Sequence, residues 1–482
     1  MRSCGILCHI SSLPSAYGIG TLGREAYRFV DFLKAAGQRY WQMLPIGPTG
    51  YGDSPYQSFS AFAGNPYFID PLLVAEKGFA ELPEARDEGD VDYGWLWQSR
   101  RHFFENMFSK FRGHEPADYG TFLQDHGWWL EDYAAFMTLK DRNGGIAREQ
   151  FSPEQRIKCT VAEDTEFYKM LQYFFYKQFL SLKQYAAEKG IKLIGDIPIY
   201  ASSDSSDVWA HPELFRLDDQ GRAYEIAGCP PDAFTPDGQR WGNPLYDWSA
   251  MERDGFEWWH RRLCHQGTLF DKVRIDHFRG FESFFVIDAA EETARNGHWE
   301  KGPGISFFNT LKSRGGRYDI IAEDLGYLTP EVEHMLQESG YPGMKVLQFA
   351  FDSRDALDYL PFCYPKNSVA YTGTHDNNTI LGWYNECDPQ VRAYAEEYMR
   401  LNGKEGIVPG VIKTVLASPS DTVILCMQDL LEKDGSARMN TPGKAGGNWS
   451  WRMRTEEISG ALAEKVRALT ELYHRLPEET TK

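Results

Sequence analysis

The nine residues "KVRIDHFRG" (272–280) place two arginines, an aspartate and a histidine around and behind a short valine-isoleucine run. A strand that simply ends is normally followed by a turn-forming residue such as Asn, Gly or Pro. Here the strand end instead carries Arg274, Asp276, His277 and Arg279. This concentration of charge indicates a strand whose end belongs to a chemical site.

Seven other runs have the same form, a short apolar stretch closed by polar residues. In chain order, with 272–278 fourth, the eight runs cover 5–13, 39–48, 191–200, 272–278, 318–326, 343–352, 368–376 and 421–430. Continuous apolar runs of this length suit strands that are buried on both faces of a parallel sheet. Helical patterns lie between them, so the sequence predicts an α/β protein built as a (β/α)8 TIM barrel. A doubly wound open sheet is the alternative, because the strand count alone does not exclude it.

Three of the intervening patterns have clear helix signals. Apolar residues recur at helical spacing over 23–37, and the stretches 329–340 and 388–403 begin with Thr-Pro and Asp-Pro. Each pattern is followed by a glycine, which commonly ends a helix. We therefore expect helices that stop at Gly37, Gly340 and Gly403.

Two connections are much longer than the others. Residues 50–190, after the second strand, include the aromatic helical pattern "FYKMLQYFFYKQFLSLKQYAAEKG" and are expected to form an inserted, mostly helical subdomain. Residues 201–270, after the third strand, contain "GCPPDAFTPDGQRWGNP", whose Pro and Gly residues indicate a long loop or insert. We expect residues 1–482 to form one catalytic barrel that carries both inserts.

The overall charge and the aromatic content narrow the class of ligand. The net charge of −18 disfavours nucleic acid and anionic membrane surfaces, which bind through Lys and Arg. Aromatic residues make up 15% of the chain, and flat rings suit the faces of sugars. The eight cysteines form no C-x-x-C pair, and no secretory signal or membrane-spanning run is present. The prediction is a cytoplasmic protein without metal or other cofactor, whose ligand is a neutral sugar.

Carboxylates end several of the predicted strands. Asp196, Asp276, Glu323 and Asp376 each follow a different apolar run, and the carboxyl ends of barrel strands meet at one mouth. Glycosidic bond chemistry needs one carboxyl to protonate the leaving oxygen and another to attack or stabilise the sugar cation. Arg274 lies on the same side of its strand as Asp276 and favours its ionised form, whereas Glu323 would need a raised pKa to act as proton donor.

Three other roles are open to these acids. Strand-end acids often cap helices or pair with arginines, but the three runs 272–278, 318–326 and 368–376, which all end in this way, together favour a site. A metal site is disfavoured because His277 and His375 have no ligand spacing. A phosphate site is disfavoured because neither G-x-x-x-x-G-K-[ST] nor G-x-G-x-x-G follows a strand.

Several segments also resemble a known family. "DIPIY" (196–200), "RIDHFRG" (274–280), "AEDLG" (322–326) and "THDN" (374–377) are similar to the four signature segments of the 4-α-glucanotransferases called amylomaltases or disproportionating enzymes, glycoside hydrolase family 77. The likeness extends through segments at 9–23, 52–70, 238–248 and 439–452, and so covers nearly the whole chain.

The resemblance implies a role for individual residues. By motif, Asp276 would be the nucleophile, Glu323 the general acid/base and Asp376 the stabiliser of the transition state. The positions expected to contact substrate are Tyr56, Asp196, Gln239, Trp241, Arg274, His375 and Asn448. The loop "CPPDAFTPDGQRWGNP" (229–244) is further expected to cover a bound sugar with Phe234 and Trp241.

The sequence therefore predicts a retaining 4-α-glucanotransferase. It would take an α-1,4-glucan as donor, hold the glycosyl group covalently, and pass it to glucose or a maltooligosaccharide as acceptor. One alternative is an α-amylase-like retaining hydrolase with the same carboxylates and water as acceptor. Another is a non-catalytic glucan-binding protein, which would not need three carboxylates.

Overall fold

Eight parallel strands close into a barrel in the computed structural model, which describes residues 2–50, 52–86, 89–231, 235–316, 318–326, 328–351, 356–444 and 446–478. The strands are β1 (Ser3–Leu7), β2 (Tyr40–Gln42), β3 (Lys192–Ile197), β6 (Lys272–Ile275), β9 (Ile320–Ala322), β10 (Gly343–Val346), β11 (Ser368–Tyr371) and β12 (Thr422–Cys426). Each pairs with the next in chain order, and β12 pairs with β1. The (β/α)8 barrel is confirmed, and all eight strands begin in or within two residues of a predicted run. The open doubly wound sheet is wrong.

The register of the barrel determines which residues meet at its mouth. Asp196 on β3 lies opposite Arg274 on β6, and Arg274 lies opposite Ile321 on β9. The segments that follow these three strands therefore begin at neighbouring points of the rim. Because side chains alternate along a strand, Arg274 and Asp276 can act on the same side.

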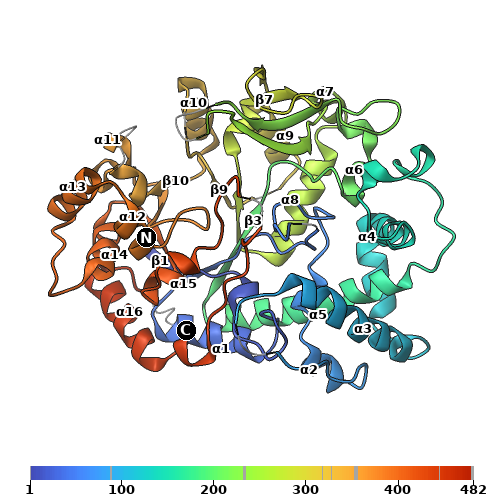
Figure 1. Ribbon diagram of the computed structural model, residues 1–482, viewed down its shortest axis with the longest axis horizontal. Helices are drawn as coiled ribbons and strands as arrows, with labels where there is room; N and C mark the ends of the chain where they lie inside the picture. Colours follow the sequence, from blue (N-terminus) through green and yellow to red (C-terminus); the bar gives the residue numbers. More distant parts are fainter. Residues whose placement is uncertain are drawn as a thin grey trace.

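Helices cover the outside of the barrel (Figure 1). The predicted helix at 23–37 is α1 (Arg24–Ala35), and Gly37 takes the left-handed φ of 68°. The predicted helix at 329–340 is α10 (Pro330–Ser339), which ends at Gly340 with φ 74°. The third, α13 (Pro389–Met399), was expected to reach Gly403 but ends four residues earlier. Arg400 takes the left-handed conformation there, with φ 54°, and the partly buried Leu401 then packs on the core.

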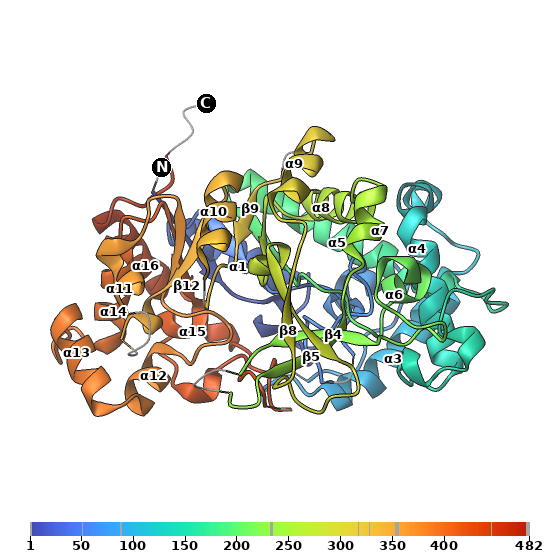
Figure 2. The same cartoon turned by 90° about the horizontal axis from the view of Figure 1, so that it is seen from above.

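The described residues of the connection between β2 and β3 form four α-helices. They are α2 (Pro71–Ala75), α3 (Tyr93–Phe111), α4 (Tyr119–Arg142) and α5 (Glu166–Glu188). Phe175, Phe179 and Leu182 of α5 are fully buried, because this helix packs against the barrel as well as against α4. Figures 1 and 2 show α3 and α4 on one side of the barrel and the C-terminal helices on the other.

The connection between β3 and β6 contains strands as well as helices. It is built from α6 (Ser206–Ala210), β4 (Glu225–Cys229), β5 (Gln239–Pro244), α7 (Trp248–Arg253) and α8 (Glu257–Leu269). After β6 follow β7 (Ser283–Asp288) and β8 (His298–Lys301). These four strands form a second, antiparallel sheet in the order β5-β4-β7-β8, so two successive connections share one sheet (Figure 2).

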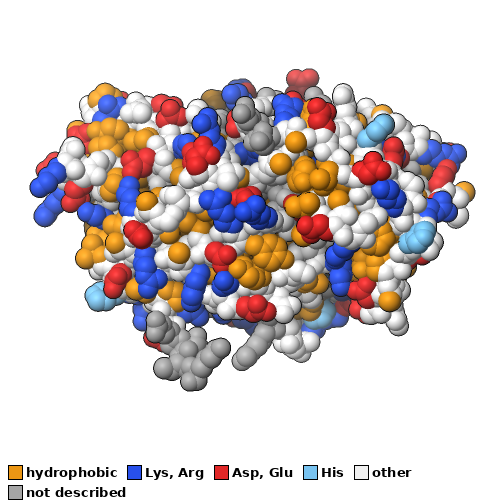
Figure 3. Space-filling model, turned by 90° about the horizontal axis from the view of Figure 1, so that it is seen from below, with side chains coloured by type: hydrophobic (Ala, Val, Ile, Leu, Met, Phe, Trp, Pro, Cys, Tyr) orange, Lys and Arg blue, Asp and Glu red, His pale blue; other side chains and the backbone are white. Residues whose placement is uncertain are grey.

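The remaining helices surround β9 to β12. They are α9 (Ile305–Ser313), α11 (Ala356–Tyr359), α12 (Ile380–Glu386), α14 (Ile407–Ala417), α15 (Met427–Leu430) and α16 (Gly460–Leu472). Within the described ranges, no helix combines the length and the apolar character that crossing a membrane would require. Figure 3 shows acidic and basic side chains interspersed on one face of the molecule, without a broad basic patch of the kind that binds nucleic acid.

Candidate active site

Arg274 lies at the centre of the cluster of carboxylates. Its Nη1 donates to both oxygens of Asp196, at 2.8 and 2.7 Å, and its Nη2 donates to Oδ1 of Asp276 at 2.8 Å. The side chain of Asp196 is fully buried, whereas that of Asp276 is 31% exposed. One guanidinium therefore binds the buried carboxylate of Asp196 on one side and, on the other, orients the carboxylate of Asp276, which is open to a ligand.

Burial raises the pKa of Asp196, and the charge of Arg274 opposes this shift. The pKa of the Arg274 guanidinium stands well above its usual value, since burial is outweighed by its carboxylate neighbours. The charge of Arg274 therefore compensates the burial of Asp196, and a single guanidinium nitrogen, Nη1, holds both carboxylate oxygens in a charge-assisted contact.

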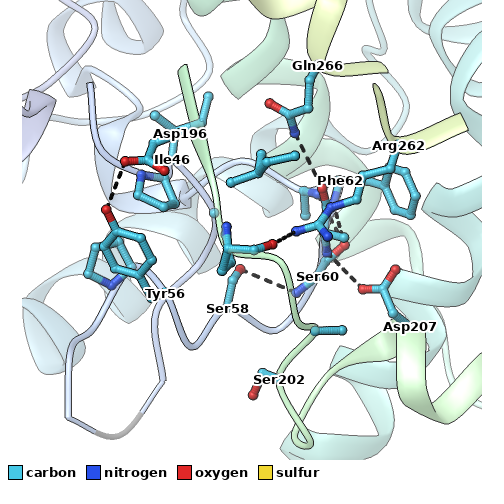
Figure 4. A pocket seen from close by; sticks show the side chains of 18 of the residues that line it. Ile46, Tyr56, Ser58, Ser60, Phe62, Asp196, Ser202, Asp207, Arg262 and Gln266 are labelled. Atoms are coloured by element: carbon cyan, nitrogen blue, oxygen red, sulfur yellow. Dashed lines mark hydrogen bonds between the residues drawn. The ribbon is translucent and has the colours of Figure 1, made fainter. Parts of the chain in front are cut away.

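Tyr56 connects this cluster to an aromatic wall. Its hydroxyl donates to Oδ2 of Asp196 at 2.9 Å (Figure 4). Its ring stacks on the ring of His375, with centroids 5.1 Å apart and 16° between the planes, and lies 5.9 Å from the Trp449 ring. Three rings from distant segments thus form one surface beside the carboxylates, as a site for sugar faces requires.

Glu323 follows β9 and is held by backbone groups rather than by side chains. Its Oε2 accepts from the backbone N–H of His277 at 2.6 Å, and its Oε1 accepts from that of Leu325 at 2.9 Å. Burial, reinforced by the charge of Asp276 and opposed by Arg274, raises the pKa of Glu323 to about 8. This carboxyl is therefore mostly protonated at neutral pH, the state that a proton donor needs.

His277 makes that contact possible through its backbone. Its φ of 53° lies in the left-handed region, which a non-glycine residue adopts only at a cost, and it turns the chain sharply after Asp276. The turn directs the His277 N–H toward Glu323, while the half-buried ring lies edge-on to Trp241 at 4.8 Å. Burial lowers the pKa of His277 to about 4, so the imidazole is neutral.

Asp376 is positioned by two residues that were not predicted. Nδ2 of Asn440 donates to its Oδ1 at 2.6 Å, and Arg438 donates to its backbone carbonyl at 2.5 Å. Nε2 of His375 lies 3.4 Å from the same Oδ1. Asn440 lies within the segment 439–452 that resembles the family, so the resemblance did point to this part of the chain. Nothing in the sequence, however, indicated that Asn440 would contact Asp376.

The other predicted substrate positions lie in two separate segments. Gln239 and Trp241 are on β5, where Trp241 Nε1 donates to Gln239 Oε1 at 3.0 Å. Asn448 uses both ends of its amide within its own loop, accepting from Thr441 N–H and donating to the Lys444 carbonyl. Phe234 lies outside the described residues.

No group of three or more His, Cys, Asp or Glu side chains in the described part of the chain is arranged to hold a metal ion. The features brought together at the mouth are two carboxylates paired with Arg274, a glutamic acid whose pKa is raised to about 8, and an aromatic wall. That combination suits glycosidic bond chemistry.

Comparison with known proteins agrees with this chemistry. The family model described as 4-alpha-glucanotransferase, glycoside hydrolase family 77, matches residues 8–458. The chain belongs to the 4-alpha-glucanotransferase family. A 4-alpha-glucanotransferase of Streptococcus pneumoniae is 46% identical to it, with 99% of this chain and 98% of that protein aligned. One from Thermus thermophilus is 45% identical, over 98% of this chain and 99% of the other.

A solved relative has the same fold over its full length. The amylomaltase from Streptococcus agalactiae in complex with acarbose is 42% identical, with a TM-score of 0.95 over 99% of this chain and 100% of that one. The family-like segments of the sequence are therefore those of a 4-alpha-glucanotransferase, and this activity is favoured over that of an α-amylase-type hydrolase.

Proposed function

We propose that this transferase works by double displacement, with retention at the anomeric carbon. A carboxylate oxygen of Asp276 attacks C1 of the donor sugar, while Glu323 gives its proton to the leaving glycosidic oxygen. The C1–O bond electrons go to that oxygen, and the glycosyl group remains as an ester of Asp276. Glu323 then takes the proton of the acceptor 4-hydroxyl, whose oxygen displaces the carboxylate from C1.

The observation that carries this assignment is the contrast between two neighbouring carboxyls. Burial raises the pKa of Glu323 to about 8, whereas Asp276 accepts a 2.8 Å hydrogen bond from the cationic Arg274. The raised pKa favours the acid form of Glu323, and the ion pair with Arg274 presents Asp276 as a carboxylate, which are the two forms that the first step requires. Asp376, 43% exposed and held by Asn440, is the third carboxylate and would stabilise the sugar cation.

The expected substrates follow from the side chains that surround these carboxyl groups. The donor would be an α-1,4-glucan and the acceptor glucose or a maltooligosaccharide. Tyr56 and His375 offer ring surface, Asp196 and Arg274 offer charged hydrogen-bonding groups, and Gln239, Trp241 and Asn448 lie on neighbouring segments. The acarbose complex of the Streptococcus agalactiae relative supports a ligand of this class.

One experiment tests both the reaction and its acceptor. The enzyme is mixed with maltotriose, and products are separated by chromatography while reducing ends are counted. Transfer yields glucose together with maltopentaose and longer chains, and the number of reducing ends stays constant. If reducing ends increase in step with maltotriose consumption, water is the acceptor and the proposed transfer is wrong.

We also propose a cytoplasmic location. The support is that all eight cysteines are free thiols, as is usual in a reducing compartment.

A further inference from the structure

A groove lies on the outside of the barrel, between the helical insert that follows β2 and helices α6 and α8 of the connection between β3 and β6. Its walls come from α4, α6, the turn after α6, and α8. Its lining includes Trp128, Asp132, His211, Glu213, Glu257 and Arg261. Its volume of about 180 Å³ is several times the ~30 Å³ that one water molecule occupies in the liquid.

We propose that this groove is a second binding site for an α-1,4-glucan chain, separate from the catalytic carboxylates. The proposal rests on the proposed substrate class. It concerns how a long glucan is held, not how its bond is broken.

Trp128 is the aromatic platform of the groove. It is 39% exposed, although the next residue, Trp129, is only 4% exposed. The ring is fixed in place, since Phe62 contacts it edge-on at 4.8 Å and the Arg261 guanidinium lies 5.5 Å from its centroid. A rigid indole that is open to solvent inside a groove, with arginine beside it, is the typical composition of a binding hot spot.

The polar groups around Trp128 suit a neutral ligand rather than an anion. Arg261 donates from Nε to Glu257 at 2.6 Å, so its charge is already compensated. His211 lies between two carboxylates, 3.9 Å from Asp132 and 3.5 Å from Glu213. The lining therefore has more acids than cations, which disfavours phosphate or nucleic acid, while it offers alternating donors and acceptors to sugar hydroxyls.

The groove also adjoins the pocket beside the catalytic cluster. Phe62 and Asp207 line both spaces, and both are labelled in Figure 4, which shows the pocket that also contains Tyr56 and Asp196. Asp207 is buried and accepts from the backbone N–H of Ala61 at 2.8 Å, which makes the partition between the two spaces rigid. A glucan held in the groove would consequently raise the local concentration of chain ends near the mouth, while a trisaccharide would be too short to use both sites.

The test compares Trp128→Ala and Arg261→Ala with Trp97→Ala. Trp97 is a suitable control because it lies on α3, is 61% exposed and does not line the groove. Binding is measured by the retardation of each protein in native gels that contain soluble amylose. Turnover is measured separately with maltotriose and with amylose, and thermal denaturation checks that each variant is folded.

We expect Trp128→Ala to weaken amylose retardation at least fivefold and to raise the KM for amylose, with kcat/KM for maltotriose within twofold of the parent. Arg261→Ala, a change at a half-exposed side chain, should act in the same direction without risk to folding. The proposal is overturned if both variants are retarded like Trp97→Ala, or if maltotriose and amylose turnover fall in proportion. A parent enzyme that converts no maltotriose would instead refute the proposed function, and weaker amylose retardation of Trp128→Ala than of Trp97→Ala would still support the groove.

Discussion

Replacing Arg274 with Met should destabilise the protein far more than the loss of an ordinary ion pair. The substitution keeps an apolar stem of similar length but removes the guanidinium. Four hydrogen bonds disappear, two to Asp196, one to Asp276 and one from Nε to the Met344 sulfur. Since the Asp196 side chain has no exposed surface, it becomes a buried charge, and among the described side chains the Tyr56 hydroxyl is the hydrogen-bond donor that remains.

Breaking a buried ion pair in this way costs about 3–5 kcal/mol of unfolding free energy, most of which is the penalty for the charge left behind. The Asp276 side chain is 31% exposed and adds little, because water can solvate it. The deficit should also depend on pH. Without Arg274 the pKa of Asp196 would rise further above its ordinary value of 3.8, so the native state would bind the extra proton and the variant would lose stability as the pH rises.

Urea denaturation followed by circular dichroism at pH 5 and pH 8 measures this effect. The matched control is Arg101→Met, which breaks two ion pairs, to Glu105 and Asp141, at a 42% exposed side chain and should cost less than about 1 kcal/mol. Adding Asp196→Asn to Arg274→Met should recover part of the loss, because the buried charge is gone. The reasoning is refuted if Arg274→Met is no less stable than Arg101→Met, or if its deficit is larger at pH 5 than at pH 8.

Four further outcomes are expected. Asp276→Asn should lower maltotriose turnover by several orders of magnitude with an unchanged circular dichroism spectrum, and residual activity above about one percent would place the nucleophile elsewhere. The kcat/KM should decline above pH about 8, where Glu323 loses its proton. The Glu323→Gln variant should not show this decline when it is assayed with α-maltosyl fluoride, because fluoride leaves without needing a proton. If the decline persists in the variant, it belongs to another group. Asn440→Ala should lower kcat about 10–100-fold, because the hydrogen bond from Asn440 to the Asp376 carboxylate is lost. The control Asn402→Ala, at an exposed side chain, should have no effect. Equal kcat values for the two variants would contradict the role of Asn440 in positioning Asp376. Exhaustive chelation should leave activity intact, and a loss that Ca²⁺ restores would argue for a calcium-dependent enzyme.

The barrel could be predicted because its strands are local signals. Each of the eight is a short apolar run with a polar end, and their carboxyl ends must converge once the barrel closes. Helix ends were less certain, as α13 shows, because Arg400 adopts the left-handed conformation that was expected at Gly403.

The parts that were not predicted depend on long-range pairing. The stretch 225–244 was expected to form a loop, but it contains β4 and β5, which are defined by their pairing with each other and by the pairing of β4 with β7. The contact of Asn440 with Asp376 joins residues 64 positions apart, and the double hydrogen bond of Arg274 with Asp196 joins residues 78 apart. Such contacts follow from the register of the closed barrel, which no single segment encodes.

The shared sheet limits how this enzyme could be recombined with its relatives. β5, which carries Trp241, is joined through β4 to β7, which follows β6 by a single helical turn. The small apolar core of Ile226, Phe285, Ile287 and Ala294 holds β4 against β7. A chimera that exchanged only the third connection would have to form β4–β7 hydrogen bonds with a strand of foreign sequence. The natural unit of exchange therefore runs from the end of β3 to the end of β8, residues 198–301, and includes Asp276, the proposed nucleophile.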